Sequence, residues 1–247
     1  MGSTFKSQIA LLFTFSCYIL IRFIGISDIS LNVFQEIYFG NVIKDTFLLL
    51  ALFILSYTFF NAARKNKKTG PTIINGSKLK LSLYIVLFFG WLSVIAHLIF
   101  DSIKLFLPFN WLDIYQFADL LDETISHIFL FLSTISSFFI MSLLEIERPL
   151  SKAIKKLEIN IMFIINLIIG VFWGLNLSEG NLSIFTSLPT MIIFLVIILW
   201  LIKKHQLSLT KRPWTLMSVI ISLSGSVTYI IWSLMVGLNP QFFSYLK

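Results

Sequence analysis

The chain has 247 residues, of which 57% are hydrophobic and only 13% are charged, and this balance excludes a soluble domain of ordinary composition. Its net charge of +7 would suit a nucleic-acid-binding protein, but the basic residues lie in short loops between apolar segments, which indicates membrane topology and no nucleic-acid partner. The single cysteine, Cys17, excludes an internal disulfide and a cysteine-rich metal site.

Seven apolar segments have the length of about 20 residues that a helix needs to cross the hydrocarbon core of a bilayer. In chain order they are residues 9–26, 42–63, 81–107, 120–144, 159–177, 184–202 and 214–238. The connections are too short to fold alone, so residues 1–247 are predicted to form one all-α transmembrane domain, a bundle of seven helices. We expect an integral membrane protein of the plasma or cytoplasmic membrane, or of an endomembrane in a eukaryote.

The positions of lysine and arginine predict the orientation, because cytoplasmic loops carry an excess of both. The N-terminus is predicted inside and the C-terminus outside, since one side then holds 15 of the 19 basic residues. Nine of the twelve carboxylates fall toward the other side, where they would attract cations. The 15 basic residues are Lys6, Arg64, Lys65, Lys67, Lys68, Lys78, Lys80, Arg148, Lys152, Lys155, Lys156, Lys203, Lys204, Lys211 and Arg212.

Two further patterns predict how the segments pack. The fifth segment carries Asn166, Gly170 and Gly174 at four-residue spacing, and small residues so spaced let helix backbones approach closely. Three tryptophans lie near predicted segment ends, where such residues commonly anchor a helix at the membrane interface. They are Trp111, Trp173 and Trp214.

The chemical signal of the sequence is a pair of polar stripes on the third and fourth segments. His97 and Asp101 lie four residues apart on the third, and Glu123 and His127 lie four apart on the fourth. Residues at this spacing share one face of a helix. A charged group at bilayer depth costs roughly 2.5 to 3.5 kcal/mol on insertion scales, so these groups require partners or a function. The two segments are antiparallel, and we expect the four groups to meet in the outer half of the membrane.

Two imidazoles and two carboxylates form a ligand set that suits zinc, and also iron or copper, with room for a water molecule. We therefore predict a divalent metal bound by His97, Asp101, Glu123 and His127. The second shell or the entry path of this site would include Ser93, Asp119 and Asp122.

Two resemblances accompany this prediction. Cation-diffusion transporters are similar in that they bind metal with residues at four-residue spacing on two helices. Ser93-x-x-x-His97 resembles part of the zinc site of the membrane hydrolases that include alkaline ceramidases and adiponectin receptors. Those hydrolases also carry a His-x-x-x-His pair in their last span, and the last segment here has no histidine.

Several functions are compatible with these patterns. The first is a metal-dependent membrane enzyme, such as a hydrolase, that acts on a membrane-embedded, lipid-like substrate. The second is a transporter or binding protein for a cation, either a metal ion or a proton. The third is an accessory subunit or sensor in which the polar pair of helices is structural, with a packing partner or a second copy covering its apolar faces. A proton relay or a haem held by the two histidines is also left open.

Overall fold

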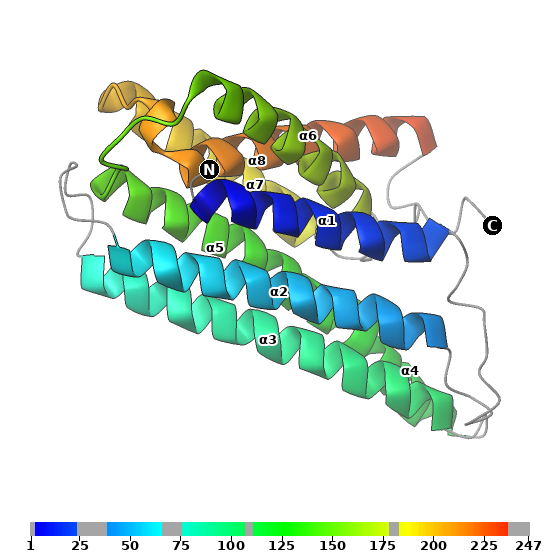
Figure 1. Ribbon diagram of the computed structural model, residues 1–247. Coiled ribbons are helices and arrows are strands. Elements are labelled where there is room, and N and C mark those ends of the chain that lie inside the picture. The colour runs from blue at the N-terminus through cyan, green and yellow to red at the C-terminus, as the bar shows by residue number, and fades with distance from the viewer. Residues whose placement is uncertain (1–2, 24–38, 66–75, 107–110, 178–182, 237–247) are drawn as a thin grey trace.

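The structure, a computed structural model, describes residues 3–23, 39–65, 76–106, 111–177 and 183–236 (Figure 1). Within these ranges the chain is helical and forms no strand, which confirms the all-α prediction. The elements are α1 (Ser3–Phe23), α2 (Phe39–Lys65), α3 (Gly76–Phe106), α4 (Leu112–Asp119), the π-helix η2 (Leu120–Ser126), α5 (His127–Glu147), α6 (Lys156–Leu177), α7 (Ser183–Lys204), the short 3-10 helix η3 (Leu209–Lys211) and α8 (Pro213–Val236).

Each of the seven predicted segments overlaps a long helix. Among the described residues, four stretches are long and apolar enough to cross a membrane, as expected of a membrane protein. They are Gly76–Phe100, Asp113–Glu147, Lys156–Leu175 and Pro213–Met235. In α2 the apolar stretch is shorter, Leu49–Asn61. That all seven helices cross the membrane therefore stays a prediction.

The start of the fourth segment differs from the prediction. The sequence predicts a start at residue 120, whereas the helix begins at Leu112 and continues through η2 and α5 to Glu147. Asp113 and Asp119 lower the hydropathy of the first turns but do not interrupt the backbone hydrogen bonds, and carboxylates are favoured near the positive end of a helix. The boundary of the apolar run is therefore not the boundary of the helix.

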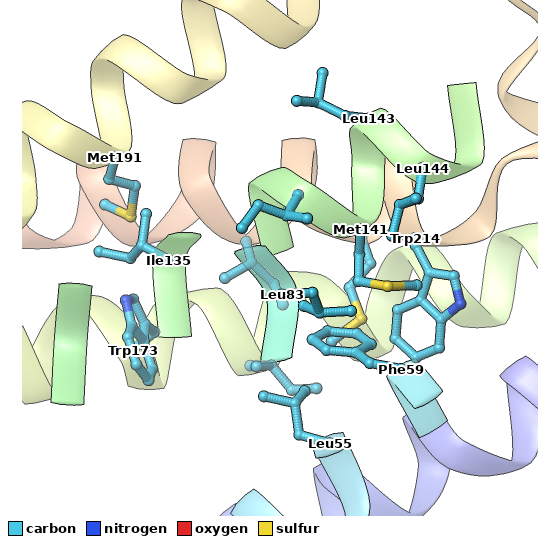
Figure 2. Close-up of a cluster of buried hydrophobic side chains, with 14 of the residues drawn as sticks. Leu55, Phe59, Leu83, Ile135, Met141, Leu143, Leu144, Trp173, Met191 and Trp214 are labelled. Atoms are coloured by element: carbon cyan, nitrogen blue, oxygen red, sulfur yellow. The ribbon is translucent and has the colours of Figure 1, made fainter. Parts of the chain in front are cut away.

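The core lies around α5, which packs against α3, α7 and α8 in the middle of the bundle (Figure 1). Phe59 of α2 contacts Trp214 of α8 edge to face, with ring centroids 5.1 Å apart, and Met141 of α5 lies beside them (Figure 2). Trp214 is 2% exposed and Trp173 is 8% exposed, so both belong to the core and their predicted role as interfacial anchors is wrong. Trp111 is exposed, as predicted.

The predicted small-residue contact of the fifth segment is confirmed, and it joins α6 to α8. A β-carbon on Gly174 would lie 2.4 Å from the carbonyl oxygen of Gly225, and one on Gly170 would lie 3.0 Å from the backbone of Ile221. Only glycine permits backbones this close. Asn166, which precedes the two glycines, donates instead to α1, from Nδ2 to the Oε1 atom of Gln8 at 3.4 Å.

Candidate functional site

His97 of α3 and His127 at the start of α5 lie beside each other where α3 packs against η2, a π-helix of seven residues, Leu120–Ser126. In a π-helix the backbone bonds run from residue i to i+5, so side chains change face relative to an α-helix, and such segments are frequent at functional sites. Asp122 and Ser126 are consequently buried, while Leu120 and Ile125 are exposed. The α-helical spacing from which Glu123 and His127 are predicted to share a face is therefore interrupted by the π-helix.

Asp122 of η2 pairs with His97 of α3. The Nδ1 atom of His97 contacts the Oδ1 atom of Asp122 in a hydrogen bond. His97 is 9% exposed and Asp122 is 0% exposed. A neutral imidazole that donates from Nδ1 carries its lone pair on Nε2, so the carboxylate selects the nitrogen with which the ring can act as a base or bind a metal.

His127, the first residue of α5, brings a second imidazole to the pair. Its ring centroid lies 5.1 Å from that of His97, and the two ring planes are inclined by 50°. On the inner side His127 is stacked on Phe131 with centroids 6.3 Å apart. Phe131 in turn makes an edge-to-face contact with Trp173 of α6. His127 therefore lies beside His97 and packs against the buried ring of Phe131.

One serine hydroxyl joins α3 to η2, and a second makes a hydrogen bond within η2. Ser93 of α3 donates from Oγ to the backbone carbonyl of Ser126, and Ser126 donates from Oγ to the carbonyl of Asp122. Both serines are buried. The bond from Ser93 fixes the backbone of η2 against α3 and so holds Asp122 opposite His97.

A cavity of about 230 Å³ lies beside the two serines. Its remaining lining is apolar, and Phe89, Leu92 and Phe129 among the lining residues are also exposed on the outside of the bundle. The cavity is thus a groove that opens on the apolar outer surface of α3 and α5. It is lined by Phe89, Leu92, Ser93, Ala96, Phe100, Leu121, Ile125, Ser126 and Phe129.

The structure describes the other predicted metal ligands only in part. Asp101 lies in α3 and Glu123 in η2, but their side chains are outside the described part of the structure. Asp119 is half-buried at the end of α4. Among the described residues, no group of three or more His, Cys, Asp and Glu is arranged to hold a metal ion. The structure thus brings together His97, His127, Ser93 and Asp122, and it leaves the four-ligand set untested.

The sequence predicts for Asp122 only a place in the second shell or the entry path of the site, because α-helical spacing favours Glu123 as the partner of His127. One signal pointed to Asp122, since it lies four residues before Ser126 within an apolar segment. Comparisons with protein-family models, with curated proteins and with solved structures found no match for this chain. The function is therefore inferred from the site itself.

Proposed function

We propose that the protein is a metal-dependent membrane enzyme, with seven helices crossing the bilayer, that hydrolyses an apolar, membrane-embedded substrate. The observation that carries this proposal is the contact between Nδ1 of His97 and Oδ1 of Asp122. Histidines that bind metals almost always donate their second ring nitrogen to a carboxylate, a carbonyl or a water, which fixes the tautomer and strengthens the ligand. Asp122 supplies that partner to His97.

In this proposal a zinc ion, with iron and copper as the other candidates, is bound by His97 and His127. The 5.1 Å separation and the 50° inclination of the two rings support it, because inclined rings at this distance can direct one nitrogen each toward a common point. Asp101 and Glu123 would complete the ligand set, and Asp119 would lie toward its entry.

The ion would supply a water molecule activated for attack at neutral pH. Hydrolysis adds that water across an ester or amide bond and releases an acid together with an alcohol or amine. The buried surroundings of His97 and Asp122 favour this chemistry, since electrostatic interactions are stronger where bulk water is excluded. Asp122 would keep the imidazole of His97 oriented throughout.

The groove beside Ser93 and Ser126 supports a substrate that arrives from the lipid. It lies within two stretches that are apolar enough to cross a membrane, Gly76–Phe100 and Asp113–Glu147, and its outer wall of Phe89, Leu92 and Phe129 is exposed. In a bilayer such a surface faces acyl chains rather than water. A substrate in this groove would reach the polar centre without crossing an aqueous phase.

A structural role is the second candidate, and the hydrogen bonds of the two serines favour it. Ser93 donates across the interface to the backbone carbonyl of Ser126, and Ser126 donates within η2 to the carbonyl of Asp122. A buried pair such as His97 and Asp122 can likewise serve to fix the register of two helices. In that case the protein would be an accessory subunit, and removing the histidines would affect stability alone.

Metal content measured by mass spectrometry on the purified full-length protein separates the two candidates. We expect about one equivalent of zinc in the wild type and none in a His97→Ala, His127→Ala double variant. His205→Ala is the matched control, because His205 is the third histidine and follows α7 outside the site. A folded wild-type protein that binds no zinc, iron or copper would overturn the proposed enzyme and favour the structural role.

A further inference from the structure

At one end of the bundle, two interhelical connections are joined to each other by backbone hydrogen bonds. They join α5 to α6 and α7 to α8. The amide of Leu150 donates to the carbonyl of Lys211 at 2.9 Å, and the amide of Ile154 donates to the carbonyl of Thr210 at 2.9 Å. The two connections therefore form one ordered surface. Its six exposed lysines define what we call the basic loop face, namely Lys152, Lys155, Lys156, Lys203, Lys204 and Lys211.

The nearby carboxylates point into the protein and leave this positive charge in place. Glu145, in the last turn of α5, is buried and accepts two hydrogen bonds from Thr215 of α8, from the backbone amide at 2.8 Å and from Oγ1 at 3.1 Å. Glu147 is also buried, and its Oε2 atom lies 3.4 Å from the position of a β-carbon on Gly76. Both carboxylates thus lie at helix N-termini, where negative charge is favoured.

Arg212 and Glu158 are two further charged groups at this end. Arg212 is buried just before α8, where it donates to the carbonyl of Ser208 at 3.0 Å. Burial lowers the pKa of its guanidinium from the usual value, and the charge of Glu145 opposes that shift. Glu158 is half-buried in the first turn of α6. The surface that faces outward is therefore dominated by the lysines.

The contact between Trp200 and Lys204 indicates where the basic loop face would lie relative to the membrane. The Nζ atom of Lys204 lies 4.5 Å from the ring centroid of Trp200, which is 54% exposed on α7. Exposed tryptophans and lysines one turn beyond them are typical of the level where the lipid headgroups begin. The apolar stretch Asp113–Glu147 ends at this end of the bundle, and the stretch Pro213–Met235 begins there. The six lysines would thus lie at the level of the headgroups.

We propose that the basic loop face binds the headgroups of anionic phospholipids in the adjacent leaflet. The positive surface and the negative phosphates are complementary in charge, and the two bonded connections hold the lysines in place before the lipid arrives. A lysine close to a membrane surface strengthens binding to anionic lipid by about fivefold at low salt. This inference is independent of the metal centre, because it depends on another end of the bundle and on other residues.

The test uses the full-length protein in nanodiscs that contain phosphatidylcholine alone or with added phosphatidylglycerol. After the protein is purified from the nanodiscs, the amount of each lipid that it retains gives its lipid preference. We expect the wild type to enrich phosphatidylglycerol, and a Lys152→Gln, Lys155→Gln variant to bind it roughly 25-fold more weakly at low salt. A Lys152→Arg, Lys155→Arg variant keeps the charge and should retain the preference.

The matched control is Lys44→Gln, Lys104→Gln, which removes the same charge near the start of α2 and the end of α3. It should bind phosphatidylglycerol as the wild type does. Equal losses in the two glutamine variants, or a wild type without preference for phosphatidylglycerol, would overturn the proposal. Unfolding temperatures of all variants in phosphatidylcholine show whether a loss of lipid binding reflects a loss of fold.

Discussion

The imidazole of His97 and the carboxylate of Asp122 meet across the interface of α3 and η2, although Asp122 lies 25 residues later in the chain. The pair is buried, and the hydrogen bond from Ser93 to the carbonyl of Ser126 joins α3 to η2 beside it. This combination of an oriented imidazole, a second histidine at 5.1 Å and an apolar groove is what the proposed function depends on.

Replacing Asp122 by asparagine tests whether the carboxylate supports a metal-binding imidazole. The side chain keeps its shape but loses its charge, and changes of this kind behind a ligand typically lower metal affinity by about 10- to 100-fold. Titration of zinc against a competing chelator measures the effect. Asp113→Asn is the control, because Asp113 is exposed in α4, and it should bind zinc as the wild type does. Unchanged affinity in Asp122→Asn would show that the contact is only structural.

Enlarging the side chain of Ala96 tests the groove. Phenylalanine at this position would fill much of the 230 Å³ cavity, so binding of a pyrene-labelled fatty acid should weaken roughly tenfold, or about 1.4 kcal/mol. Fluorescence titration in detergent gives the affinity. Ile193→Phe adds a similar ring at an exposed position of α7 and should leave the affinity as it is. Equal binding by both variants would place the probe elsewhere on the protein.

α3 and α5 show most clearly how much of the fold can be predicted from the sequence. Hydropathy predicts both helices, because apolar runs of this length have few alternatives in a membrane. It places the start of the fourth segment at residue 120, since Asp113 and Asp119 are polar, while the backbone is already helical at Leu112. The depth of Trp173 and Trp214 is missed for a related reason, because a ring near a segment end can turn inward as well as toward the interface.

The site is predicted in part. Four-residue spacing identifies His97 and His127 correctly as neighbours across two helices. It favours Glu123 over Asp122 because the rule assumes an α-helix throughout, and η2 is a π-helix. Nothing in the local sequence of Leu120–Ser126 distinguishes the two helix types. The hydrogen bond from Ser93 to η2, a tertiary contact that a local pattern does not contain, accompanies the change of face.

Substituting Gly174 by alanine tests the close contact of α6 and α8. The new β-carbon would lie 2.4 Å from the backbone oxygen of Gly225, so the helices must separate, and overpacking of this kind typically costs about 1 to 3 kcal/mol. Gly90→Ala is the control, because its β-carbon would meet the side-chain hydroxyl of Ser133, which can rotate. Equilibrium unfolding in detergent compares the two, and equal stability would contradict the packing account.

The crossing of α7 can be tested with single cysteines in a Cys17→Ser background. Ser183→Cys and Lys204→Cys place a thiol at each end of the helix. If α7 spans the bilayer with the predicted orientation, an impermeant maleimide should label Ser183→Cys from outside only and Lys204→Cys from the cytoplasmic side only. Labelling of both from the same side would remove α7 from the set of spanning helices.

The most direct test of the central claim is X-ray absorption at the zinc edge of the purified, zinc-loaded protein. The account predicts two imidazole nitrogens at about 2.0 to 2.1 Å with oxygen ligands beside them, and the loss of one imidazole in His127→Ala. A spectrum without imidazole ligands, or one that His97→Ala and His127→Ala leave unchanged, would contradict it. The pair of His97 and Asp122 would then be a structural contact between two helices.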